Sequence, residues 1–177
     1  MKKIVLGLLT AFILLSCSKK VDFSPRPLNM DRYVCHVCKM GLDNPNYNLQ
    51  AINENGEVRW YDDIGCLAED IRDGDFNTWK GKKYKIWIGD AETGKWIDAE
   101  KAYYRYGDDT PMGYGYGALE KKPDTGEVFT FEQVLDRINK GISKRAEFIK
   151  KHKMSVSGGE MKCGEGKCGS GKCGGGK

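Results

Sequence analysis

The sequence predicts an α+β fold of two small modules, each a hairpin or small sheet followed by a helix, with a long C-terminal helix and a disordered Cys/Gly-rich tail. Short polar–apolar alternations separated by Asn- and Gly-containing turns are typical of β-hairpins. Two such hairpins carry similar sequences, Arg59-Trp60-Tyr61-Asp62 and Lys95-Trp96-Ile97-Asp98. This parallel suggests two related modules.

The predicted elements lie within residues 30–153, which we expect to form one domain. Asp62 or Asp63 is placed to cap the first helix, and Thr130 with Gln133 forms a capping box for the last one. Both helices carry apolar residues at helical spacing. In chain order we expect strands at 48–52 and 58–61, a helix to about residue 72, strands at 84–88 and 95–98, a short helix at 99–102, a strand at 103–106, and a helix from 131 to about residue 152.

The N-terminus has the features of an export signal. A short basic segment precedes an apolar run from residue 4 to 15, which is too short to span a bilayer as a helix. The run ends in Leu14-Leu15-Ser16-Cys17, which resembles the lipobox of bacterial lipoproteins. Residues 1–16 are therefore predicted to be a signal peptide and Cys17 to be lipidated. The alternative is an uncleaved anchor with an incidental cysteine.

Residues 17–29 are predicted to be the lipidated cysteine and an extended tether, because Pro25 and Pro27 favour extended backbone. Ser18, directly after the cysteine, points to the outer membrane in this class of signal. We therefore expect the protein on the periplasmic face, anchored by lipid. In an oxidising compartment the remaining cysteines must form disulfides or bind metal.

Composition excludes several classes of function. The chain has 177 residues, of which 40% are hydrophobic and 31% charged, as in an ordinary globular protein. Its net charge of +4 is too balanced for a nucleic-acid-binding protein, which carries a clear basic face. It holds only two histidines, no serine elbow and no His-Glu-x-x-His motif. We therefore expect no enzymatic activity and no nucleic-acid partner.

Residues 154–177 differ in composition from the rest of the chain. Cys-Gly-x-Gly-Lys recurs at a period of five, which places the thiols at Cys163, Cys168 and Cys173. With much glycine and few apolar residues this tail cannot form a core, so we predict that it is disordered. Regularly spaced thiols on a flexible chain suit auxiliary capture of soft metal ions. The alternative is a solvated tail whose cysteines have no such role.

The segment Cys35-His36-Val37-Cys38-Lys39-Met40 concentrates soft metal ligands. A metal site, a redox pair and a disulfide are the alternatives. A zinc or iron–sulfur site usually needs a second ligand pair, and the predicted domain offers only Cys66. A thioredoxin-like pair would begin a helix after a strand, whereas this segment precedes a loop and a hairpin. A haem attachment motif would place the histidine after the second cysteine.

The spacing Cys38-x-Met40, together with a methionine in a glycine-rich loop, favours copper. Thiolate and thioether sulfurs select Cu(I) over hard cations. Met112 lies between Pro111 and Gly113, outside any amphipathic element, so a role in the core does not explain it. The loop from 110 to 117 lacks the Lys-Ser/Thr pair of a phosphate-binding loop. Its glycines are expected to permit close backbone approach.

Several motifs in this order resemble the NosL family, the accessory lipoproteins of nitrous oxide reductase. The resemblance runs from the leader to about residue 135. It is carried by the lipobox, Cys35-x-x-Cys38-x-Met40, Val58-x-x-Tyr61-Asp62-Asp63-Ile64-Gly65-Cys66, Lys95-Trp96-Ile97-Asp98-Ala99-x-x-Ala102-Tyr103-Tyr104 and Thr110-Pro111-Met112-Gly113-Tyr114-Gly115.

The resemblance implies a periplasmic Cu(I) chaperone that supplies nitrous oxide reductase together with a membrane ABC-type maturation complex. It also implies an α+β fold. Cys38, Met40 and Met112 match the family's copper ligands, while Cys35 matches a cysteine present in only some members. Members commonly have glycine at the position of Lys39, and the Cys-rich tail is not part of the pattern.

Two further residues are weaker candidates. His36 lies beside the site, but in an extended segment its side chain points opposite to its neighbours. Cys66 is expected within the first helix as a core thiol or disulfide partner rather than a ligand. The alternative functions are an exported thiol–disulfide protein that uses Cys35 and Cys38, and a general copper-buffering or resistance lipoprotein.

Overall fold

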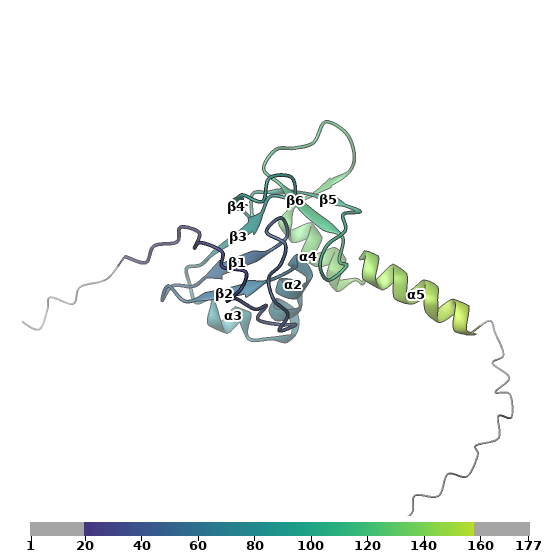
Figure 1. Ribbon diagram of the computed structural model, residues 1–177, viewed down its shortest axis with the longest axis horizontal. Coiled ribbons are helices and arrows are strands. Elements are labelled where there is room, and N and C mark those ends of the chain that lie inside the picture. Colours follow the sequence, from purple (N-terminus) through teal and green to yellow (C-terminus); the bar gives the residue numbers. More distant parts are fainter. Residues whose placement is uncertain (1–19, 158–177) are drawn as a thin grey trace, which may run out of the picture.

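The computed structural model describes residues 20–157, which contain two small antiparallel sheets and four helices (Figure 1). The larger sheet has the strand order β2-β1-β3-β4 and the smaller one β6-β5-β7. The predicted α+β class is confirmed. The strands are β1 (Leu49–Ile52), β2 (Val58–Tyr61), β3 (Lys85–Gly89), β4 (Trp96–Asp98), β5 (Tyr103–Tyr106), β6 (Tyr116–Leu119) and β7 (Val128–Phe129), and the helices are α2 (Ile64–Asp73), α3 (Phe76–Trp79), α4 (Phe131–Asn139) and α5 (Lys144–Ser157).

The second predicted hairpin, β3–β4, belongs to the same sheet as the first. β3 pairs with β1, so that Ile86 lies opposite Ala51 and Ile88 opposite Leu49. All four side chains are buried, and β1 pairs on its other side with β2. The similar sequences at 59–62 and 95–98 therefore mark two hairpins of one sheet, because their apolar faces share a single core.

The smaller sheet differs from the prediction. Residues 99–101 form a turn rather than a helix, and the Tyr104 hydroxyl donates to the Ala99 carbonyl over 2.8 Å. β6 forms in what was predicted to be the end of the glycine-rich loop. It pairs with β5, and its residues are all buried, including Tyr116 and Ala118. Because of the glycines around β6, the sequence pattern predicted a loop here and not a strand.

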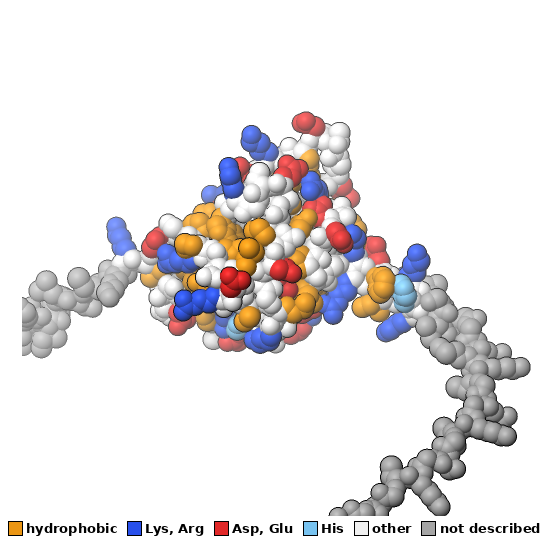
Figure 2. All heavy atoms as spheres, viewed as in Figure 1, with side chains coloured by type: hydrophobic (Ala, Val, Ile, Leu, Met, Phe, Trp, Pro, Cys, Tyr) orange, Lys and Arg blue, Asp and Glu red, His pale blue; other side chains and the backbone are white. Residues whose placement is uncertain are grey.

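The predicted long C-terminal helix is two helices. Thr130 and Gln133 form the expected capping box of α4. The helix ends near Lys140, and Gly141 has φ = +74°, a left-handed conformation that terminates helices and that glycine adopts without strain. α5 then leaves the body of the domain (Figure 1) and carries the exposed apolar side chains Phe148 and Ile149. Figure 2 shows hydrophobic and basic side chains next to one another on this projecting segment.

Part of the predicted tether contacts the larger sheet. The Trp87 ring N–H donates to the Phe23 carbonyl, and the Gln50 side chain pairs with both backbone groups of Arg26 over 2.6 and 3.0 Å. Leu28 packs against the core. Among residues 20–157, no helix combines the length and the apolar character needed to cross a bilayer. The predicted signal peptide and Cys17 lie outside the described residues, and the predicted domain boundaries stay predictions.

Candidate metal site

The segment from Cys35 to Met40 forms a tight loop. The Cys35 N–H donates to the Met40 carbonyl over 2.8 Å, and the Lys39 N–H donates to the Cys35 carbonyl over 3.2 Å. The His36 N–H donates to the carbonyl of Trp60 in β2 over 2.7 Å, which fixes the loop to the sheet. Lys39 has φ = +64°, a left-handed backbone conformation that glycine adopts with less strain than lysine.

This loop brings two thiols against the start of α2. The Sγ atoms of Cys35, Cys38 and Cys66 and a carboxylate oxygen of Asp62 all lie within 4.8 Å of one another. Cys38 donates to Asp62 Oδ2 over 3.2 Å and Cys66 donates to Asp62 Oδ1 over 3.1 Å. Cys35, Cys66 and Asp62 are buried, and Cys38 is partly exposed. All three cysteines are free thiols.

Asp62 is the functional candidate that sequence reasoning missed. The sequence indicates Asp62 only as a possible helix cap, but Asp63 is the cap, with its carboxylate accepting the Gly65 N–H over 3.0 Å. Asp62 instead faces the thiols. Asp62 lies just before the cap of α2, so helical spacing does not place it beside Cys66, and no local signal in the sequence identifies it. Cys66, predicted to be a core thiol in the first helix, is in that helix and in this cluster.

A second segment approaches from the smaller sheet. Asp63 Oδ2 accepts the Thr110 hydroxyl over 2.6 Å and the Met112 N–H over 3.2 Å. The same carboxyl is deeply buried, and that burial raises its pKa. The loop is also held by packing, because a Cβ on Gly65 would lie 2.0 Å from the Tyr114 ring. Met112 is therefore positioned by Asp63, the cap of α2, which directly follows Asp62.

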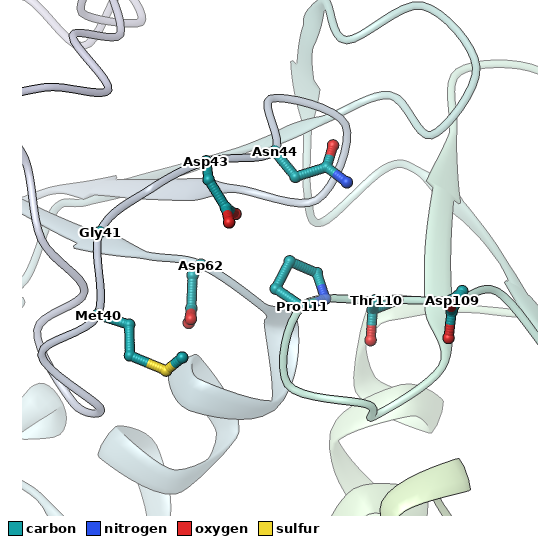
Figure 3. A pocket seen from close by; sticks show the side chains of 8 residues that line it. All are labelled: Met40, Gly41, Asp43, Asn44, Asp62, Asp109, Thr110 and Pro111. Carbon is teal, nitrogen blue, oxygen red and sulfur yellow. The ribbon is translucent and has the colours of Figure 1, made fainter.

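Met40 and Met112 line the same hollow, of about 470 Å³, together with Pro111 and Phe148. Met40 is 49% exposed. A neighbouring hollow of about 340 Å³ is lined by Met40, Asp62 and Pro111. Figure 3 shows the Met40 sulfur and the Asp62 carboxylate reaching into this space, with the 109–111 segment across from them. Met40 and Met112, two of the predicted ligands, thus line one hollow although they lie far apart in the sequence, whereas Cys38 lines neither hollow.

The three thiols have different proton affinities. The adjacent Cys66 thiol and nearby backbone N–H groups lower the pKa of Cys35 to about 6, against the effect of burial. Burial and the Asp62 carboxylate raise the pKa of Cys38 to about 12. The pKa of Cys66 is raised by Cys35, by burial and by Asp62. Within the cluster, Cys35 therefore loses its proton more readily than Cys38 or Cys66.

This arrangement bears on the redox alternative. A thiol that attacks disulfides must be both ionised and accessible. Here Cys35 has the lowered pKa but is fully buried, whereas Cys38 is partly exposed but has a raised pKa. The segment also does not begin a helix, as the sequence indicated. Coordination by a soft cation, which displaces protons from clustered sulfurs, suits these three thiols better.

His36 lies in a different cluster. Its Nε2 is 3.9 Å from Asp70 Oδ2, and Asp75 completes a group of three possible ligands. Arg59 already occupies that group, because its guanidinium pairs with Asp70 over 3.0 Å and with Asp75 over 2.7 Å. Burial and the positive charge of Arg59 lower the pKa of His36. His36 is therefore directed away from the thiols, and the reason is the turn at residues 36–38 rather than the expected alternation of an extended segment.

Comparisons with known proteins give a similarity of fold. No family model and no curated protein matches the sequence. A solved structure, described as the copper chaperone NosL from Shewanella denitrificans, is similar with a TM-score of 0.53 and 15% sequence identity. The match covers 63% of this chain and 96% of that chain. The NosL-like fold is thus confirmed, whereas the individual ligand roles stay predictions. Cys163, Cys168 and Cys173 lie outside the described residues.

Proposed function

We propose that this protein is a Cu(I) carrier rather than an enzyme, with an exchangeable copper site formed by Cys38, Met40 and Met112. One observation carries the proposal: Met40 and Met112 line one hollow, and Met40 also shares a hollow with Asp62, which accepts a hydrogen bond from Cys38. A thiolate with two thioethers selects Cu(I). The fold, shared with a copper chaperone, supports the same function.

Exposure of this site fits delivery rather than storage. Met40 is half exposed and Cys38 is partly exposed, so a partner's ligands can reach the metal before it leaves. Thioether ligands are neutral and bind more weakly than thiolates, which favours exchange. On the resemblance of the sequence, the proposed client is nitrous oxide reductase, reached with a membrane ABC-type complex. The proposed location is the periplasmic face, through lipid on Cys17.

Anaerobic titration of Cu(I) against a chromophoric chelator tests the site. Met40→Leu and Met112→Leu keep the side-chain size but remove sulfur, and each is expected to weaken binding by at least ~10-fold, since even supporting residues of metal sites contribute that much. Met30→Leu is the matched control, because Met30 is equally exposed and lines neither hollow. Unchanged affinity in both site variants would refute the carrier site.

The tail is proposed to collect additional copper. Replacing Cys163, Cys168 and Cys173 by serine is expected to lower the number of Cu(I) ions bound per chain while leaving the Met40- and Met112-dependent affinity unchanged. Loss of the tight site in this variant would instead show that tail thiols belong to it. A copper-buffering protein without a client would bind the same ions but would not transfer them to apo nitrous oxide reductase, which a transfer assay measures.

A further inference from the structure

The proposed exchange site uses only one of the three clustered thiols. Cys35 and Cys66 are buried, are not paired in a disulfide, and lie within 4.8 Å of Cys38 and of each other. Free thiols in a core are ordinarily separate apolar side chains. Three thiols that lie against one buried carboxylate instead form a preorganised set of metal ligands. The proposed site of Cys38, Met40 and Met112 does not explain this arrangement.

We propose that Cys35, Cys66 and Cys38 form a second, buried Cu(I) position, with Cys38 shared between this inner position and the outer one. The choice of Cu(I) rests on the proposed function. A metal–sulfur bond of about 2.3 Å places three sulfurs around one ion about 4.0 Å apart. The three sulfurs lie within 4.8 Å of one another, so side-chain adjustments of less than about 1 Å bring them to that spacing.

Protons must leave these thiols when the metal binds, and the cluster provides a path for them. The S–H groups of Cys38 and Cys66 both point at Asp62, one at each carboxylate oxygen. Asp62 also lines the hollow beside Met40, so a proton that it receives can pass to water. The Cu(I) ion then offsets one of the two negative charges that the departing protons leave beside the buried carboxylate.

The two positions differ in what they offer a metal ion. The outer one has one thiolate and two thioethers at the rim of an open hollow. The inner one has three thiolates below the surface, since Cys35 and Cys66 are each at most 1% exposed. Thiolates bind Cu(I) more strongly than thioethers. The inner position therefore retains its ion, while the outer position exchanges, and the bridging Cys38 makes a two-copper cluster.

The test uses the full chain with serine at Cys17, Cys163, Cys168 and Cys173, so that only the clustered thiols remain. Under anaerobic, reducing conditions this chain is expected to bind two Cu(I) ions. X-ray absorption should show a copper–copper scattering path. Cys66→Ser is expected to bind one ion and to lose that path. Ala68→Ser is the matched control, because it places a hydroxyl at another buried position of α2 without removing a thiol.

The outcomes separate this inference from the proposed function. If the double variant Met40→Leu and Met112→Leu binds one Cu(I) ion where the parent chain binds two, the outer site is supported, whatever the result for Cys66→Ser. A single ion in the parent chain, or a count unchanged by Cys66→Ser, overturns the inner position and leaves the outer site standing. If circular dichroism shows that Cys66→Ser does not fold, Cys35→Ser is used in its place. A parent chain without the copper–copper scattering path would by itself overturn the inner position.

Discussion

The Asp63 carboxylate accepts a hydrogen bond from the backbone N–H of Met112 over 3.2 Å, although the two residues are 49 positions apart. The same carboxylate caps α2, directly after the Asp62 that contacts Cys38 and Cys66. One buried side chain thus fixes the spacing between the thiol cluster and the methionine loop. The two halves of the site depend on each other through it.

Asp63→Asn is expected to destabilise the protein by about 1–3 kcal/mol, because the amide cannot accept all three hydrogen bonds that the carboxylate accepts. The loop of Met112 should loosen, so Cu(I) affinity should fall by ~10-fold or more, as for other residues that orient ligands. Chemical denaturation and chelator competition measure the two effects. Asp73→Asn, at the exposed end of the same helix, is the control, and an equal effect there would refute the linkage.

Gly65→Ala is expected to disturb the loop that carries Met112. A Cβ at this position would lie 2.0 Å from the Tyr114 ring, which is itself held by a hydrogen bond to Glu69. Overpacking of this kind costs about 1–3 kcal/mol. Gly41→Ala, where the added Cβ meets nothing within 4 Å, should change the free energy of unfolding much less. Similar melting temperatures for the two variants would contradict this reading of the contact.

Lys39 adopts a left-handed backbone conformation, with φ = +64°. Lys39→Gly should relieve the steric cost of about 1 kcal/mol that a residue with a Cβ carries there, and should keep the loop and its Cu(I) affinity. Lys39→Val should have the opposite effect, since a β-branched residue suits this conformation least. Thermal denaturation of the metal-free protein compares the three chains. A more stable valine variant would show that the loop has another conformation in solution.

The pH dependence of the metal-free protein should follow Cys35. Its pKa is lowered to about 6, so its thiolate stabilises the folded state above the usual thiol pKa, and this contribution is lost as the pH falls through 6. The difference in unfolding free energy between the parent and Cys35→Ser should therefore shrink from pH 9 to pH 6. Thiolate absorbance should show one transition near pH 6, absent from Cys35→Ser. A transition that survives the substitution would assign it to another group.

The structure also explains which parts of the fold were predictable. β1, β2, α2 and the start of α4 follow from local signals, namely alternation, caps and helical spacing. β6 and the break between α4 and α5 do not follow from local signals, because a glycine in the sequence is compatible with a strand, a loop or a helix end. Which hairpins share a sheet was also not predictable locally, since pairing of β3 with β1 depends on a common buried face.

For the site, the sequence by itself determined the ligand chemistry. The thiols and thioethers of residues 35–40, and a methionine in a glycine-rich loop, indicate a soft metal ion wherever they lie. Only the tertiary structure decided that Asp62 and Cys66 join Cys35 and Cys38, and that Met112 and Met40 line one hollow. The physical reason is that these contacts join segments far apart in the chain, and long-range packing, not local spacing, sets the distances between their side chains.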